Sequence, residues 1–439
     1  MKTKLKTTAA MLLIAAVTIL VSGAFTDKHT VAKSKAICCA KQEEHGCIFR
    51  TLLGLEDFDK THIVKNKELV DAALNRGLQW IVSAQNENGG WGSGSHYHQE
   101  VLNPHEVEAD PASTALVGMA LLRNDQDKND SKYGAQLKKA VNYLLLAVEQ
   151  SGAKANNITQ LTNTQPQIKL GRNIDVILTS QFFTNYLQQS QLEAAPKQRI
   201  EKALQKCVQM IQRTQDNDGS WKDGGWAPVL QSALANNALE SAEDFGVKVD
   251  STVLSKSRDY QKNNFDAETN SVITGKAAGV MLYSVSGSAR ASAKEAREAQ
   301  NKIDKAKKEG KLKADAKVNE ENLVVAGYGT LDAKKYASAY NIRNAASIKA
   351  QTKDVLNGFG SNGGEEYLSY LMTGESLIVS GDNEWKKWYD QTTGRLIQIQ
   401  NNDGSWNGHH CITSPVFCTA TCMLILSIDK DIDFLVKVK

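Results

Sequence analysis

A short motif that recurs with fixed offsets constrains the fold of this chain more than any other feature. Gln85-Asn-Glu-Asn-Gly-Gly-Trp91 returns as Gln215-Asp-Asn-Asp-Gly-Ser-Trp221 and again as Gln400-Asn-Asn-Asp-Gly-Ser-Trp406. The Asn-Gly or Asp-Gly pair in each copy is typical of a tight turn, because glycine adopts backbone conformations that other residues resist. The tryptophan that follows has a large apolar face to bury. The repetition predicts a fold built from similar units.

Each copy of the motif lies between two stretches with helical patterns. The stretch before the motif is amphipathic, and the stretch after it is more apolar and richer in small residues. Asp110-Pro111 and Ser414-Pro415 place a capping oxygen before a proline at the first helical position. The preceding helices are predicted over 68–84, 196–214 and 385–399, and the following ones over 111–122, 229–239 and 415–426.

Weaker copies of the same helix–loop–helix unit fill the intervals between the clear ones. Their helices are predicted over 137–149 with 174–187, from 251 with 275–285, and over 333–355 with 365–379. Helix pairs without alternating strand patterns predict an all-α fold. Six such pairs can close on themselves, which removes the exposed ends of an open array. We therefore predict an α6/α6 toroid over residues 66–429.

The Gln-x-x-x-Gly-x-Trp repeats resemble the QW motifs of the squalene-hopene cyclase and protein prenyltransferase superfamily, over roughly residues 66–427. The resemblance implies a toroid whose inner helices line a central cavity. The stretch 363–366, taken with 404–411, also resembles exported bacterial proteins described as prenyltransferase and squalene oxidase repeat proteins. Because the same toroid also serves polysaccharide lyases and thioester proteins, the resemblance predicts a fold rather than an activity.

The cyclase acid motif of that superfamily is incomplete here. Such cyclases protonate an alkene with the central aspartate of an Asp-x-Asp-Asp-Thr-Ala stretch. The nearest match is the stretch 110–115, in which Asp110 remains while Ala112 and Ser113 replace the next two aspartates. The proton donor is therefore missing, and we expect no cyclase activity by that route.

The zinc ligands of the prenyltransferases are also missing from their expected places. Those enzymes hold zinc with an aspartate, a cysteine and a histidine, and no matching stretch lies on a predicted inner helix. His409, His410 and Cys411 are adjacent, so their side chains are expected to diverge rather than share one metal. The Gly-Cys-Gly-Glu-Gln run of thioester proteins is absent too. We predict no metal and no cofactor.

In the toroid that the resemblance implies, motif loops and inner-helix N-termini open at one mouth. This would gather acids and imidazoles there, and we expect the helix N-termini to keep Asp110 and Glu366 ionised. Histidine beside carboxylates is typical of acid–base catalysis near neutral pH. The candidate catalytic residues are His409, His410, Glu366 and Asp110, and the candidate ligand-binding residues are Glu365, His96, His98 and Tyr367.

Structural roles remain open for most of these residues. Asp110 is well placed to cap a helix, and Glu365 and Glu366 are well placed to stabilise a first helical turn through its dipole. Two adjacent glutamates on a helix point about 100° apart, so only one of them should face a cavity. Glu375, within an apolar stretch, either pairs inside the wall or faces the cavity.

The N-terminal sequence is typical of an export signal. A basic start over 1–6 precedes an apolar run over 9–21 and small residues over 22–24, and that run is short for a membrane span. We predict a signal peptide over 1–24, an exported protein of the periplasm or extracellular space, and no membrane span after cleavage. An N-terminal extension over 25–65 and a tail over 430–439 flank the toroid.

Charge and cysteine content bear on partners and compartment. The formal charge of +3 comes from lysines within 1–24, and the rest of the chain is balanced, which argues against a nucleic-acid partner. The seven cysteines are an odd number, so one thiol is free or pairs between chains. A bridge between the N-terminal and C-terminal cysteine clusters is a hypothesis. The cysteines are Cys38, Cys39, Cys47, Cys207, Cys411, Cys418 and Cys422.

The segment 290–321 departs from the repeat, since it is rich in alanine, lysine and glutamate. We expect an exposed helix or a mobile arm there, either as a solvated charged face or as a contact for a protein partner.

Three functions follow from these expectations, and whether the chain is an enzyme stays open. The first is an exported binding protein whose central cavity holds a small hydrophobic ligand or a glycan. The second is an enzyme that acts on a polysaccharide or another extracellular polymer through a His/carboxylate pair at the cavity mouth. The third is a scaffold that contacts its partner through 290–321.

Overall fold

The computed structural model describes residues 67–125, 131–356, 363–381, 383–432 and 435. The chain divides into two compact units, residues 1–43 and 44–439, and every described residue belongs to the second. The predicted signal peptide over 1–24, the extension over 25–65 with its three cysteines and most of the 430–439 tail lie outside the described residues. Within the described part, no helix is long and apolar enough to cross a membrane.

The described part is mostly helical, which confirms the predicted all-α class. Its one small sheet is an antiparallel pair of two-residue strands, β1 (Phe265–Asp266) and β2 (Ser271–Val272), in which Phe265 pairs with Val272. Both strands follow helix α10 in the loop that leads to α11.

One set of helices, which we call the inner helices, corresponds to the stretches predicted to follow each loop. They are α4 (Pro111–Asn124), α7 (Ile174–Gln189), α9 (Pro228–Phe245), α11 (Met281–Lys308), α15 (Glu365–Val379) and α17 (Pro415–Leu426). Most residues of these helices are buried, in keeping with their high content of apolar and small side chains.

A second set, which we call the outer helices, is amphipathic. They are α3 (Lys67–Ser83), α5 (Gly134–Gln150), α8 (Ala194–Arg213), α10 (Ser251–Lys262), α13 (Thr330–Lys349) and α16 (Trp385–Gln398). The remaining short helices are α6 (Gln165–Lys169), α12 (Glu320–Val325), α14 (Lys353–Leu356), η2 (His96–His98), η3 (Pro104–Glu106) and η4 (Ile428–Asp431).

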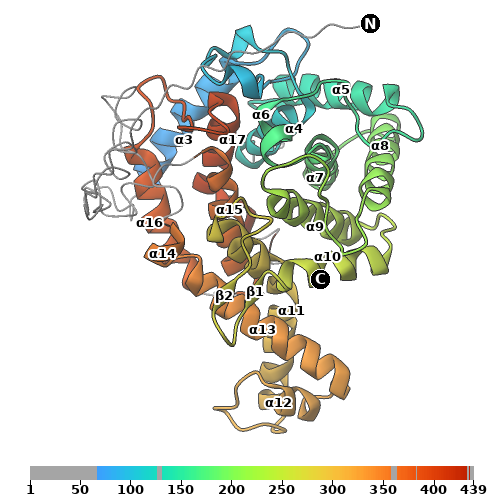
Figure 1. Ribbon diagram of the computed structural model, residues 1–439, viewed down its shortest axis with the longest axis vertical. Coiled ribbons are helices and arrows are strands. Elements are labelled where there is room, and N and C mark those ends of the chain that lie inside the picture. Colours follow the sequence, from blue (N-terminus) through green and yellow to red (C-terminus); the bar gives the residue numbers. More distant parts are fainter. Residues whose placement is uncertain (1–66, 126–130, 357–362, 382, 433–434, 436–439) are drawn as a thin grey trace, which may run out of the picture. The chain divides into compact units, whose positions relative to one another are not determined.

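The inner helices pack against one another in chain order (Figure 1). Helix α4 lies against α7, α7 against α9, α9 against α11, α11 against α15, and α15 against α17, while α17 lies against α4. The outer helices contact the inner ones, as in α5 on α4, α8 on α7 and α10 on both α9 and α11.

The motif glutamine joins each loop to the outer helix of another unit. The Gln85 side-chain amide donates to Gly89 O at 2.9 Å and to Gln136 O of α5 at 3.1 Å. Gln215 makes the same pair of bonds to its own loop and to α10. Gln400 donates to its loop and, at 2.9 Å, to Ala73 O of α3. The glutamine therefore holds neighbouring units together.

The motif tryptophans are structural, as their apolar faces suggest. Trp91, Trp221 and Trp406 are fully buried. In each, the indole N–H donates at 2.8 Å to a carbonyl in the last turn of the preceding outer helix. Each tryptophan backbone N–H also donates at 2.9 Å to a hydroxyl of the following inner helix. A single residue thus connects both helices of its unit.

The motif glycine is required by conformation and by space. Gly404 has a φ of 95°, in the left-handed region. A Cβ atom there would lie 2.7 Å from Arg76 O of α3, closer than atoms approach without a shift. The turn can therefore lie directly on the neighbouring outer helix only because the residue is glycine.

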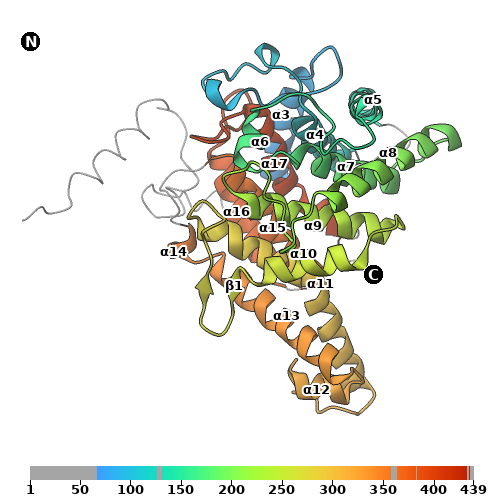
Figure 2. The same cartoon turned by 45° about the vertical axis from the view of Figure 1, so that its right-hand side comes forward.

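The segment 290–321 differs from the expected exposed helix or mobile arm. Its first part continues helix α11 to Lys308, and an alanine-rich face of that helix is buried against α13. The second half of α11, with α12 and α13, encloses its own small hydrophobic cluster around Ile303 and Leu323 (Figures 1 and 2). Alanines at spacings of three and four residues allow this close packing, while the lysines and glutamates cover the remaining faces.

Cys207, Cys418 and Cys422 are buried free thiols, and Cys411 is a half-buried one. Cys418 and Cys422 lie on helix α17, where they pack as small apolar residues. The proposed bridge to the N-terminal cysteines involves residues outside the described part and stays a hypothesis.

Candidate functional site

The N-termini of the inner helices lie together, as the repeat predicts. At α4, Asp110 Oδ1 accepts from Ser113 N at 2.8 Å, and Oδ2 accepts from Ser93 N at 2.8 Å. The helix-cap role of Asp110 is therefore confirmed. The expectation of an ionised group is not met: burial, followed by the charge of Asp175, raises the pKa of Asp110 to about 7. Desolvation outweighs the helix N-terminus here.

Asp175 lies in the first turn of α7 and was not identified as a candidate from the sequence. Its Oδ1 accepts from Ala112 N at 3.2 Å, and its Oδ2 accepts from the Gln167 amide at 2.7 Å and the Asn157 amide at 3.1 Å. Burial raises the pKa of Asp175 above its ordinary value despite these donors. The residue links α4 to α7 through hydrogen bonds to the chain itself.

Glu365 and Glu366 begin α15 and are buried, in contrast to solvated first-turn charges. Lys169 Nζ lies 2.8 Å from Glu365 Oε1, with the two side chains 2% and 0% exposed. The Tyr283 hydroxyl of α11 lies 3.0 Å from Glu366 Oε1 and 3.2 Å from Glu365 Oε1. Burial, followed by the charge of Glu365, raises the pKa of Glu366 well above its ordinary value. The expectation that Glu366 is held ionised is therefore wrong.

Lys169 is the residue that the sequence analysis missed at this point. It ends the short helix α6, which Thr164 and Gln167 start with a reciprocal capping box. Burial lowers the pKa of Lys169, but Glu365, Cys411 and Glu366 together more than offset this, and the pKa lies above its ordinary value. A lysine at the end of a five-residue helix carries no periodic signal, so its burial could not be read from the sequence.

His410 and Cys411 approach Glu365 from the loop before α17. One ligand atom of each of these three residues lies within 4.8 Å of the others. This differs from the expected divergence of adjacent side chains, and it coincides with a left-handed backbone at Cys411, whose φ is 59°. Gly363, just before α15, forms a parallel bridge with His410 and holds this loop in place.

A thiolate, an imidazole and a carboxylate would suit zinc by type. Here, however, Lys169 Nζ pairs with that carboxylate and lies 3.5 Å from Cys411 Sγ. Burial, followed by the charge of Glu365, raises the pKa of the Cys411 thiol to about 12. In this arrangement the lysine ammonium supplies the positive charge beside the carboxylate and the thiol.

The remaining candidate residues lie farther out or serve packing. His96 is half-buried, and its ring contacts the ring of Trp226, with centroids 5.3 Å apart. His98 is exposed and lies 3.3 Å from Glu100, and His409 is half-buried in the loop beside His410. Tyr367 is fully buried within α15. The structure thus brings Glu365, Glu366 and His410 together and leaves His98 at the surface.

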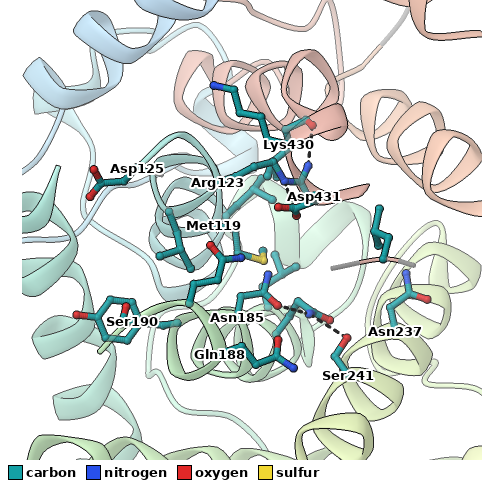
Figure 3. A pocket seen from close by; sticks show the side chains of 18 of the residues that line it. Met119, Arg123, Asp125, Asn185, Gln188, Ser190, Asn237, Ser241, Lys430 and Asp431 are labelled. Carbon is teal, nitrogen blue, oxygen red and sulfur yellow. Dashed lines mark hydrogen bonds and ion pairs between the residues drawn. The ribbon is translucent and has the colours of Figure 1, made fainter. Parts of the chain in front are cut away.

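The opposite ends of the inner helices enclose a space. A cavity of about 870 Å³ has walls from every inner helix (Figure 3). Among the described residues that line it, none belongs to the candidate catalytic set. The buried acids therefore fill one end of the inner-helix bundle, and the cavity occupies the other. This corrects the expectation that the candidate residues surround the cavity mouth.

Two buried arginines in the cavity wall are paired with acids. Arg123 Nε of α4 donates to Asp431 Oδ2 at 2.7 Å, and its Nη1 donates to Leu424 O at 2.7 Å. Arg290 of α11 lies 3.3 Å from Glu375 Oε2 and 3.4 Å from Glu240 Oε2. Glu375 is thus paired in the wall and also lines the cavity, so both readings of this residue hold.

Amide and hydroxyl side chains form the wall contributed by α7 and α9. Gln181 Nε2 donates to Asn185 Oδ1 at 2.8 Å and to Ser241 Oγ at 3.1 Å. Gln188 and Ser241 lie across the cavity from Arg123 and Asp431 (Figure 3). This wall offers both donors and acceptors, and its one acid among the described residues, Asp244, lies 2.8 Å from Lys294 Nζ of α11.

Comparisons with protein-family models, with curated proteins and with solved structures find no match for this chain.

Proposed function

We propose that the chain is an α6/α6 toroid that binds a small ligand in the space between its inner helices. The order of helix contacts supports the toroid, because α17 follows α15 and also lies against α4. The observation that carries the binding role is the cavity of about 870 Å³ with walls from all the inner helices. Ligand sites in proteins have volumes of this order.

The buried residues at the other end favour binding over cyclase chemistry. Asp110 accepts three hydrogen bonds from Ser93 and Ser113 and lies outside the cavity wall. Glu366, with its raised pKa, lies against Tyr283 rather than against open space. These groups stabilise the packing of inner-helix N-termini and leave the cavity without a strong acid from the superfamily motif.

A second candidate function is polymer-directed catalysis at the half-buried loop. The proximity of His410 to Glu365 and Cys411 favours it, since an imidazole beside a carboxylate is a common acid–base pair. Replacing His410 with alanine should abolish turnover of such a polymer and leave the melting temperature unchanged. If the variant melts at a lower temperature and the unmodified protein turns over no polymer, the histidine serves the packing of this loop.

Native mass spectrometry of the protein purified from its host tests the binding role. We expect a retained ligand, seen as a mass above that of the chain and released on denaturation. Leu371→Trp, which fills the cavity from α15, should reduce this ligand, and Leu331→Trp on the exposed face of α13 should not. If Leu371→Trp fails to fold, Asn237→Phe from α9 takes its place. Equal ligand retention in the filled and control variants would refute the proposal.

A further inference from the structure

The cavity wall changes character along the inner helices. Leu116, Leu178 and Leu234 line it from the earlier turns of α4, α7 and α9, and Leu368 does so from the first turns of α15. The later turns of the same helices contribute the charged, amide and hydroxyl side chains, together with Met119, Leu122, Leu371 and Met372. The floor at the earlier turns is therefore apolar, and the polar groups are concentrated at the rim. This gradient suits a ligand with one apolar end and one polar end.

Both arginines at the rim are already matched within the protein, and the Lys430 ammonium donates to Asn124 Oδ1 at 2.7 Å. Arg123 pairs with Asp431, and Arg290 pairs with Glu375 and Glu240, at distances of 2.7–3.4 Å. An anionic head group would have to displace a buried carboxylate from its arginine, and separating such pairs is costly. Neither Arg123 nor Arg290 is therefore available to pair with a phosphate or carboxylate of a ligand.

The helix ends at the rim also disfavour an anion. Helices α4, α7, α9, α15 and α17 all end on this side, so the partial negative charge of their C-termini points toward it. Arg123 partly neutralises this charge by donating to Leu424 O in the last turns of α17. The field at the rim favours hydrogen-bond donors in the ligand over additional negative charge.

The amide and hydroxyl groups of α7 and α9 provide acceptors for such donors. Asn185, Asn237 and Ser241 present amide and hydroxyl groups to the cavity. The buried Gln188 Oε1 has no hydrogen-bond partner among the described residues. A buried acceptor without a partner is unfavourable in an otherwise well-packed protein, and a hydroxyl of the ligand would satisfy it once the Gln188 amide turns toward the cavity.

We propose that the cavity takes a neutral amphiphile whose head group carries hydroxyls and whose apolar part reaches the leucine floor. This inference rests on the proposed binding function and names the chemical class of its ligand. The same head-group chemistry occurs in glycolipids and in alkylated polyols. It excludes the diphosphate head groups that prenyl-transferring enzymes use.

Isothermal titration of the full chain with three probes tests the inference. Octyl β-D-glucoside, below its micellar concentration, carries both the apolar tail and the hydroxylated head. Octyl phosphate keeps the tail and replaces the head with an anion, and glucose keeps the head alone. We expect octyl glucoside to bind about tenfold or more tightly than octyl phosphate, and glucose not to saturate.

A matched pair of variants locates the binding to this wall. Gln188→Leu removes the unpartnered acceptor and should weaken octyl glucoside about tenfold, with little change for octyl phosphate. Gln205→Leu, on the exposed face of α8, makes the same chemical change away from the cavity and should alter neither affinity. Unchanged melting temperatures in both variants exclude a folding defect.

The outcomes separate this inference from the function it rests on. If octyl phosphate binds as tightly as octyl glucoside, the proposed neutral head group is wrong, but the proposed binding function stands. Glucose binding as tightly as its octyl derivative would overturn the amphiphile. If no probe binds, the inference fails, and the proposed function fails with it only if the purified protein also retains no ligand.

Discussion

Replacing Lys169 with methionine should destabilise the protein more than any surface charge change. The Lys169–Glu365 pair is separated by 2.8 Å, with side chains 2% and 0% exposed. At an effective dielectric constant of about 20, unit charges at this distance attract by about 6 kcal/mol. The loss of this attraction is partly offset, because methionine has no charge that must be desolvated on folding. A net loss of about 3–5 kcal/mol in the free energy of unfolding is therefore expected.

The exposed pair Lys67–Asp71 provides a matched control, since its atoms are also 2.8 Å apart but its side chains are 72% and 43% exposed. Lys67→Met should cost less than about 1 kcal/mol, because water screens the attraction. Urea denaturation followed by far-ultraviolet circular dichroism measures both losses under one set of conditions. The comparison isolates burial, as the distance and the chemical change are the same.

A double variant separates the lost attraction from lost packing. Lys169→Met combined with Glu365→Gln removes both charges and should be less destabilised than Lys169→Met alone, with a coupling of about 2–3 kcal/mol. If Lys169→Met costs no more than Lys67→Met, or if the double variant loses the sum of the single losses, the buried ion pair does not stabilise this end of the inner helices.

Two further predictions concern a carboxyl group and a turn. Because the pKa of Asp110 is raised to about 7, the folded protein holds a proton there that the unfolded chain releases above about pH 4. The resulting stabilisation is complete below about pH 4 and disappears as the pH rises through about 7. Asp110→Asn should flatten the fall in melting temperature between about pH 4 and pH 7, and an unchanged profile would contradict the raised pKa. Gly404→Ala should cost more than about 2 kcal/mol, because its Cβ would meet Arg76 O at 2.7 Å in addition to the left-handed strain. Gly310→Ala has left-handed strain but no atom within 4 Å of its Cβ, so it should cost about 1 kcal/mol; equal losses in the two variants would refute the close-approach explanation.

The helices were predictable because the motif that joins them acts locally. In each copy the glutamine bonds across its own loop four residues on, and the tryptophan indole bonds ten residues back to the end of the preceding helix. Helix α15 was predicted with its observed bounds, Glu365–Val379, since a glycine-rich stretch precedes its apolar periodicity. Local hydrogen bonding and hydrophobic periodicity both depend on residues that lie close together in the sequence.

The site was less predictable because burial depends on distant parts of the chain. The pKa of Asp110 is set by burial and by Asp175, and neither effect leaves a trace near Asp110 in the sequence. Lys169 and Tyr283 reach the glutamates from separate helices. The alanine face of α11 was overlooked because its lysines and glutamates dominate the composition, although the spacing of the alanines does indicate a packed helix face.

The bond from Gln400 to Ala73 O links residues 327 positions apart and has a consequence for biosynthesis. Helix α3 finds its main neighbours in α16 and α17, near the other end of the chain. While the protein is being made, the apolar face of α3 with Val70, Leu74 and Leu78 must wait for those helices to be synthesised. Folding of this unit therefore finishes only after α16 and α17 are translated, and α3 needs shielding from aggregation until they emerge.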